Sequence, residues 1–294
     1  MPLHDLVEYF NGRFGREHRS SYRPFILKDK KVRGLFGPIL IDSRFSPIRH
    51  TVKPTNIIGH AAQIEVSTHA TQYLCENEIE NLLANNEKQP TSLESIINFD
   101  RLSRTVHMLN FLTLLPSHSS LFLEVDPRHI LGIKHDHGVY FGEVIAQCGL
   151  NTQYVVIVLS VHSQYARYYR ELLAGLDNYR QLGYQIALKF DYRAKDETVL
   201  DLITKLSPNY VSVSANYLDH GNDSVVLDNL DELTTVVASV NGQSILQKVD
   251  QKKTHSLARS ANFDLVEGSY YRAIAFDYLG KLETTGHPLE ANQS

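Results

Sequence analysis

Five acidic residues stand where the sequence predicts the ends of strands, and carboxylates at such positions could do chemistry together. They are Glu124, Asp126, Asp191, Asp250 and Glu267. Converging carboxylates bind hard divalent cations. A simpler explanation is that these residues are solvent-exposed charged side chains at the ends of strands. The sequence therefore predicts no metal site and no cofactor from this set, with a rewired metal site as the alternative.

Two other groups of polar residues lack the arrangement that chemistry would need. Residues 134–137, Lys-His-Asp-His, contain possible metal ligands, but they precede a predicted helix for which Asp136 is a good N-cap. Hydroxyl groups also occur near predicted strand ends, but none has the base and orienting partner of an activated nucleophile. These hydroxyl candidates are Ser160 (two residues before His162), Ser212 and Ser214.

Positive charge is concentrated near the N-terminus of the sequence. The net charge is −4, yet residues 1–50 hold 10 Lys and Arg against 5 Asp and Glu, so the rest of the sequence carries −9. Basic residues between Arg13 and Arg33 alternate with aromatic ones, a pattern that could bind nucleic acid. Glu17 and Asp29 interrupt the run, which favours a solvated hairpin of 25–27 against 39–41 instead.

Composition and cysteine use predict a cytoplasmic globular protein. Hydrophobic residues make up 43% of the sequence, enough for a sizeable core, but no stretch reaches the roughly 18 apolar residues of a membrane span. No signal-peptide apolar core occurs at the N-terminus. Cys75 and Cys148 lack metal-motif spacing and are expected to be isolated thiols, as in a reducing compartment.

The segment from Tyr154 to Asp191 sets the expected architecture. Val155 to Leu159 is an uninterrupted, mostly β-branched run, typical of a strand buried on both faces. Apolar residues then recur at helical spacing as far as Leu182, and Gly183 stands at the expected C-cap. Another strand, 184–190, follows. Two parallel strands need such a crossover, so this is a βαβ unit.

Strands and helices alternate through the rest of the sequence after an irregular start. A strand at 45–48 and one at 56–66 have too short a link for a helix, so they are expected to be antiparallel. Eight strands in all predict a (β/α)8-type barrel, with a doubly wound open sheet as the competitor. The other expected helices are 68–86, 99–115, 137–148, 198–206, 226–240 and 253–261, and the other strands are 121–125, 210–214, 244–249 and 263–266.

The order of these segments resembles the EAL domain, the bacterial cyclic di-GMP phosphodiesterase family. The resemblance rests on Phe-Ser-Pro-Ile at 45–48, Ile-Ile-Gly-His-Ala-Ala-Gln-Ile at 57–64 and Leu-Phe-Leu-Glu-Val-Asp-Pro-Arg at 121–128. It continues through 183–188, 206–211 and Asp-Leu-Val-Glu-Gly at 264–268. The family fold is a modified (β/α)8 barrel with an antiparallel first strand. The resemblance implies an EAL-like barrel at 45–272, an N-terminal extension at 1–44 and a C-terminal tail at 273–294.

The same resemblance implies that the catalytic positions are substituted. Family enzymes hold divalent metals with carboxylates and an Asn, assisted by a lysine. Valine and phenylalanine cannot ligate a cation, and a lysine puts a positive charge where the metal would lie. The resemblance therefore implies a degenerate member with no catalytic residues and no metal. The substituted family positions are Ala61, Glu124, Val158, Lys189, Phe190, Ser212, Ser214 and Gln247.

Nucleotide binding is also expected to be lost. The resemblance places Glu65 where family members have a phosphate-binding arginine, and Glu267 where they have a base-contacting glutamine. Carboxylates at these positions would repel an anionic dinucleotide instead of forming a charge-assisted pair.

We therefore expect a catalytically inactive EAL-like protein that regulates by binding another protein, as inactive family members do. Candidate contact surfaces are the helical segment 165–182 and the extension 1–44, and a homodimer is plausible. The alternatives are a cyclic di-GMP sensor without hydrolysis, a residual phosphodiesterase with a rewired site, and last a nucleic-acid binder that uses 1–44.

Overall fold

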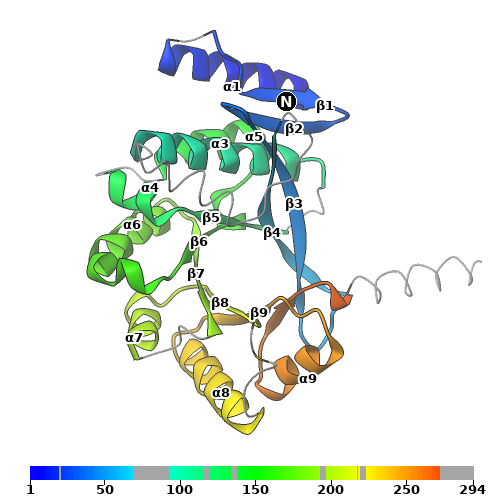
Figure 1. Ribbon diagram of the computed structural model, residues 1–294, viewed down its shortest axis with the longest axis vertical. Helices are drawn as coiled ribbons and strands as arrows, with labels where there is room; N and C mark the ends of the chain where they lie inside the picture. The colour runs from blue at the N-terminus through cyan, green and yellow to red at the C-terminus, as the bar shows by residue number, and fades with distance from the viewer. Residues whose placement is uncertain are drawn as a thin grey trace, which may run out of the picture.

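Eight strands close into a barrel around which the rest of the protein is arranged (Figure 1). The computed structural model describes residues 1–19, 21–68, 93–114, 119–133, 138–192, 197–216, 218 and 223–271. The order around the barrel is β3-β10-β9-β8-β7-β6-β5-β4, and β4 pairs with β3 to close it. The barrel strands are β3 (Ile39–His50), β4 (Ile57–Thr68), β5 (Ser120–Val125), β6 (Val155–Ser160), β7 (Gln185–Asp191), β8 (Tyr210–Ser214), β9 (Gln243–Gln247) and β10 (Leu265–Glu267).

The direction of β3 distinguishes this barrel from a regular (β/α)8 barrel. β3 runs antiparallel to both of its barrel neighbours, β4 and β10, whereas the five pairings from β4 round to β9 and the β9–β10 pairing are parallel. The prediction of a barrel with an antiparallel first strand is confirmed. The competing open sheet is excluded because the β3–β4 ladder joins the two ends of the sheet.

The predicted βαβ unit is present where the sequence placed it. Residues 155–159 of β6 are all buried, which explains why this strand shows no polar alternation. η2 (Ser163–Tyr168) and α6 (Tyr169–Gln181) cross over to β7, which pairs in parallel with β6. Gly183 follows the helix with φ +87°, a left-handed conformation that glycine adopts without steric cost.

The remaining helices pack outside the barrel, mostly close to their predicted positions. The helix expected at 99–115 begins earlier and ends earlier, at 93 and 111. A short helix after β5 was not predicted; Asp126 caps it by accepting from the Arg128 amide at 2.8 Å. The helix expected at 68–86 lies outside the described residues. The helices are α3 (Leu93–Phe111), α4 (Pro127–Gly132), α5 (Val139–Cys148), α7 (Glu197–Leu206), α8 (Asp223–Ser239) and α9 (Lys252–Ser260), with η1 (Thr152–Tyr154) before β6.

The N-terminal residues form α1 (Leu3–His18) and a hairpin of β1 (Phe25–Lys28) and β2 (Lys31–Phe36). The predicted pairing of 25–27 with 39–41 is wrong, because β2 lies between them and pairs with both β1 and β3. Asp29 and Lys30 both have positive φ, +52° and +62°, as a two-residue hairpin turn requires. β3 continues across the predicted boundary at 44/45, so the division of the chain there stays a prediction.

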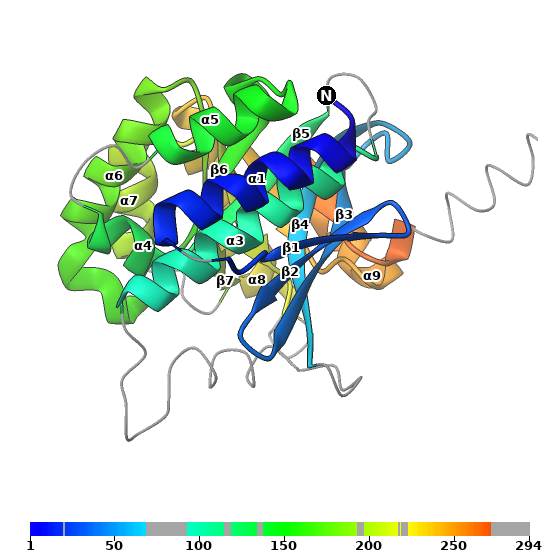
Figure 2. The ribbon, with the colours of Figure 1, turned by 90° about the horizontal axis from the view of Figure 1, so that it is seen from above.

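Within the extension, α1 lies on the helical layer (Figure 2), whereas β2 pairs with barrel strand β3. α1 lies over α5, where Tyr9 donates to Glu143 at 2.6 Å and the Arg13 guanidinium lies 4.3 Å from the centre of the Tyr140 ring. Asn11 is buried and exchanges two hydrogen bonds with the backbone of Phe25, which fastens β1 to α1. The predicted tail after residue 272 lies outside the described residues.

Two hydrophobic cores fill the protein. One lies between the barrel and the helices, and Cys148 packs against it as a free, partly buried thiol, while Cys75 lies outside the described residues. The other fills the barrel interior; its members are Ile48, Phe122, Val156, Val158, Ala187, Tyr210, Ile245 and Leu265. In the described ranges, no helix is both long enough and apolar enough to cross a membrane.

Candidate functional site

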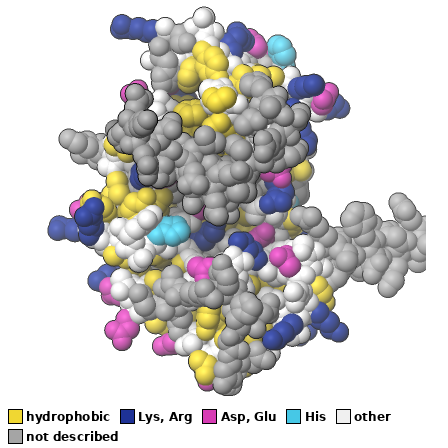
Figure 3. All heavy atoms as spheres, viewed as in Figure 1, with side chains coloured by type: hydrophobic (Ala, Val, Ile, Leu, Met, Phe, Trp, Pro, Cys, Tyr) yellow, Lys and Arg dark blue, Asp and Glu magenta, His cyan; other side chains and the backbone are white. Residues whose placement is uncertain are grey.

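The candidate site is the mouth of the barrel, where the parallel strands end above the interior core. Side chains of alternate residues face the interior, so the strand that buries Ala187 turns Lys189 to the same side two residues later. In the same way Phe122 is followed by Glu124, and Leu265 by Glu267. The sequence thus places charged residues directly above an apolar floor. In Figure 3, side chains of both charges lie close together near the middle of the face that Figure 1 shows.

An ion pair spans the mouth between β5 and β7. The Lys189 ammonium donates to Glu124 Oε2 at 2.8 Å, and the Ser160 hydroxyl, on the strand between them, donates to the other oxygen. Lys189 lies opposite Ser160 in the ladder. Burial opposes ionisation of Glu124, but the Lys189 charge and the two hydrogen bonds outweigh it and lower the pKa of the carboxyl. The mouth therefore holds a charged, hydrogen-bonded pair.

Of three other positions that the resemblance assigns to the family site, two lie at the barrel interior and one does not, and none of their side chains can bind a metal ion. Val158 lies opposite both Glu124 and Ala187 in the ladders and belongs to the interior core, and Ala61 packs against that core from β4. Phe190 is buried in the outer core with the helices, because its neighbours Lys189 and Asp191 take the inward phase of β7. Phe190 thus lies in the wall of the barrel and not in its mouth.

The far side of the mouth carries hydroxyl and amide groups. Ser212 lies opposite Lys189, and Ser214 lies opposite both Asp191 and Gln247. Both serines are buried, and Ser214 Oγ accepts from the Asn216 amide at 3.3 Å. With Ser160, these side chains give the mouth a polar lining on β6, β8 and β9. Such a lining can hydrogen-bond a ligand, but it has few oxygens of the kind that hard cations prefer.

Glu267 is the most buried acid of the mouth, with 6% of its surface exposed. Burial raises the pKa of its carboxyl, although a hydrogen bond from Ser46 and the charge of Lys189 act in the opposite direction. Asp250 also contributes to the rise through its negative charge. Glu267 and Asp250 are thus close enough to interact, which makes the β10 side of the mouth acidic.

The five acids do not gather into one metal-binding group. Asp126 caps α4 and also binds the Arg128 guanidinium at 2.7 Å, and Asp250 accepts from the backbone and hydroxyl of Ser269. Among the described residues, no set of three or more His, Cys, Asp or Glu side chains is arranged to hold a metal ion. Residues 134–137, with the predicted cap Asp136, lie outside the described residues.

Glu65, expected at a phosphate-binding position, lies on β4 opposite Asp42. Its carboxylate forms an ion pair with Arg44 on β3 at 3.5 Å. Arg44 also donates to Gln63 at 2.6 Å, so the guanidinium is held by β4 groups on the neighbouring strand. The carboxylate of Glu65 therefore meets a cation of this chain, and an anionic ligand would have to compete with it.

The Glu124–Lys189 pair was missed in the sequence, although a signal for it exists. The apolar residues that precede Glu124 and Lys189 predict which residues of β5 and β7 face the barrel interior. Two residues of opposite charge that both face the interior can meet across the barrel when only one strand lies between theirs. The lengths of the side chains then allow the contact, which the structure shows.

The comparisons with solved structures identify the fold. Klebsiella pneumoniae BlrP1, solved with calcium and cyclic di-GMP, is similar with a TM-score of 0.65 at 14% identity, over 78% of this chain and 54% of its own. A standalone EAL protein of Vibrio cholerae in its cyclic di-GMP-bound form gives 0.61 at 16%, over 79% and 90%. The EAL domain of Xanthomonas citri FimX, in complex with cyclic di-GMP, gives 0.62 at 12%, over 90% and 91%.

This chain spans about half the length of the BlrP1 chain. No protein-family model matches the sequence, and no curated protein is significantly similar to it. The structural likeness nevertheless extends over at least 78% of this chain in each of these comparisons. It includes the closed barrel with one antiparallel strand that the resemblance in sequence implied. The protein therefore has the fold of the EAL domains.

Proposed function

We propose that this protein is a catalytically inactive EAL-like regulator in cyclic di-GMP signalling, which acts by binding another protein. The observation that carries the proposal is the Glu124–Lys189 ion pair, with its 2.8 Å contact across the mouth. By the sequence resemblance, Glu124 and Lys189 stand where family enzymes bind their metals. A lysine ammonium already neutralises Glu124, and a divalent cation beside it would be repelled.

The neighbouring residues support the same proposal. Val158 and Ala61 contribute only carbon atoms to the mouth, and Phe190 faces the helices. Two-metal hydrolysis of a phosphodiester requires several converging oxygen ligands and a water between the two ions. Glu267 is buried beside Asp250, and burial raises the pKa of its carboxyl.

A cyclic di-GMP sensor without hydrolysis is the second candidate. The complexes of the structural neighbours with cyclic di-GMP favour it, because the same barrel accepts that ligand in those proteins. The electrostatics of this mouth oppose it: Glu65 and Glu267 stand at the positions that the resemblance assigns to nucleotide contacts, and both are acidic. Repulsion of two phosphodiester groups would weaken binding.

Turnover and calorimetry separate these possibilities. We expect no hydrolysis of cyclic di-GMP with Mg²⁺ or Mn²⁺, and no heat of binding at micromolar protein. Heat without turnover would replace the proposal by the sensor. Turnover that is lost in Glu124→Gln but kept in Asp201→Asn, a matched change in the exposed α7 pair Asp201–Lys205, would overturn the claim of inactivity.

The binding partner is sought with the intact chain. Crosslinking in cell extract, followed by reconstitution with the purified candidate, is expected to give a complex of fixed stoichiometry. Sedimentation of the protein alone measures whether it forms a homodimer. A monomer that forms no reconstitutable complex would contradict the regulatory role, whichever result the calorimetry gives.

A further inference from the structure

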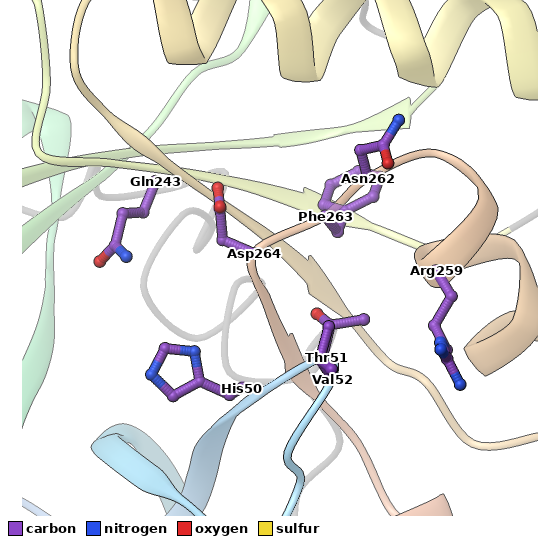
Figure 4. A pocket seen from close by; sticks show the side chains of 8 residues that line it. All are labelled: His50, Thr51, Val52, Gln243, Arg259, Asn262, Phe263 and Asp264. Atoms are coloured by element: carbon purple, nitrogen blue, oxygen red, sulfur yellow. The ribbon is translucent and has the colours of Figure 1, made fainter.

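Buried hydroxyl groups without a hydrogen-bond partner in the described part of the chain occur at both ends of the barrel, but they differ in access. Thr51 lines a hollow at the end opposite the mouth (Figure 4), and its hydroxyl oxygen is sealed from solvent. Ser212, in the mouth, is 2% exposed, yet its unpartnered oxygen is not sealed in this way. A molecule in the mouth can therefore hydrogen-bond to Ser212, whereas the hollow in Figure 4 offers no such group.

The strand ladders place Ser212 on the inner face of the barrel. It lies opposite Lys189 on β7 and opposite Ile245 on β9, and Ile245 belongs to the interior core. Residues that lie opposite each other in a ladder point to the same face of a sheet. Tyr210, two residues earlier on β8, is also part of the interior core. The Ser212 hydroxyl thus lies directly above the apolar floor of the mouth.

Two further hydrogen-bond acceptors lie on the next strands round the barrel, β9 and β10. Gln247 comes two residues after Ile245 and so faces the interior as well, and its amide has no hydrogen-bond partner among the described residues. The ladder pairs Leu246 with Val266, so the residues that follow them, Gln247 and Glu267, lie side by side. Neighbouring strands are about 4.8 Å apart, so one donor atom between them can reach acceptors on both.

The charge of Glu267 has no counterion at close range. The residue is 6% exposed, and no Lys or Arg of the described ranges forms an ion pair with it. Lys189 donates to Glu124 at 2.8 Å, and Lys248 is exposed. Asp250 adds a second negative charge nearby. A cation that donates hydrogen bonds stabilises a buried carboxylate, so this side of the mouth favours a positively charged ligand over an anion.

We propose that the β8–β10 side of the mouth binds a primary ammonium group, as carried by a free alkylamine or by a lysine side chain of the protein partner. The three N–H donors of an ammonium match three acceptors, which are the Glu267 carboxylate, the Gln247 carbonyl and the Ser212 hydroxyl. This ligand rests on the proposed function, because a mouth that held two divalent cations would repel an ammonium.

Calorimetry and ligand-observed NMR on the full chain test the site with probes of one chain length. Pentylamine represents a free amine, and Nα-acetyl-lysine amide represents a lysine of a partner. We expect saturable binding of at least one of them; the tighter of the two identifies the source of the ammonium. Trimethylpentylammonium has the same charge but no N–H donor, so it is expected to bind about tenfold more weakly than pentylamine, and pentanol is expected not to bind.

Two conservative variants test the residues of the site. Glu267→Gln removes the charge and keeps the shape, and it is expected to weaken amine binding about tenfold. Ser212→Ala removes one neutral hydrogen bond and is expected to weaken it about fivefold. Asp201→Asn removes an exposed carboxylate on α7 and is expected to leave binding unchanged. Melting curves show whether each variant is folded, and the comparison of probes on the wild type does not depend on them.

The ammonium site is refuted if neither amine binds saturably, if trimethylpentylammonium binds as tightly as pentylamine, or if binding survives both substitutions. The proposed function fails in a different experiment. Turnover of cyclic di-GMP overturns the inactivity, whereas a lack of amine binding in a protein without turnover overturns only the ammonium site.

Discussion

His107 is expected to make the stability of the protein depend on pH. This histidine is buried in α3 with 3% of its surface exposed, and its Nδ1 lies 2.8 Å from the hydroxyl of Ser43 on β3. The ring also packs edge-to-face on Phe45. Burial lowers the pKa of His107 from 6.5 to about 4, because the negative charges of Asp100 and Asp42 compensate only in part. The imidazole is therefore neutral in the folded protein at pH 7.

The sign and the size of the effect follow from proton binding. Between pH 6.5 and about pH 4 the unfolded chain binds a proton on His107 that the folded protein does not bind. Stability is therefore lost as the pH falls through this window. The linkage relation gives a loss of about 2 kcal/mol between about pH 7 and about pH 5, and of about 3 kcal/mol by about pH 4. Such a loss is a large part of the stability of an ordinary domain.

Urea unfolding at a series of pH values measures this loss. We expect His107→Asn, which keeps a polar group near Ser43 but cannot titrate, to lose about 2 kcal/mol less than the wild type between about pH 7 and about pH 5. Burial also lowers the pKa of His129, but this residue contributes equally to the pH dependence of the wild type and of the variant. His4→Asn is the matched control, because the His4 side chain is 73% exposed. Parallel pH profiles of the wild type and His107→Asn would refute the reasoning.

Three further predictions concern side chains and glycines with contrasting surroundings. Arg104 is buried against Asp100, so Arg104→Met leaves a buried carboxylate without its cation and is expected to cost about 3–5 kcal/mol in urea unfolding. Lys189→Met removes a half-exposed ion pair and is expected to cost about 1 kcal/mol or less, although it leaves the Glu124 carboxylate without its cation. Gly268→Ala would place a Cβ 2.1 Å from a backbone oxygen and is expected to prevent stable folding. Gly12→Ala in α1 meets only a flexible arginine and is expected to stabilise the protein by about 0.5–1 kcal/mol. Soluble yield and melting temperature check this last pair.

The alternating part of the fold could be predicted because each of its strands has an unambiguous pattern. The run 155–159 favoured a doubly buried strand, and the helical spacing after it favoured a parallel partner. The short α4 was missed because six residues show little periodicity, although Asp126 followed by Pro127 is a helix-start signal. The β1–β2 turn was missed because Asp29-Lys30 is not one of the usual left-handed turn pairs.

The mouth could be predicted in outline, but its contacts could not. The resemblance named the positions, and strand alternation then separates the inward Lys189 from the outward Phe190. The meeting of Glu124 with Lys189 depends on how far the barrel brings β5 and β7 together, which alternation alone does not fix.

The charge of Glu124 at the mouth is balanced by a residue of this chain. A carboxylate above an apolar floor needs a cation to offset its charge. In metal-dependent enzymes a divalent ion can supply that charge; here Lys189 supplies it from within the chain, and Ser160 completes the hydrogen bonds of Glu124. The barrel can therefore close around Glu124 without a bound ion. A mouth built in this way has its charges paired before any ligand arrives, which is what the proposed binding role needs.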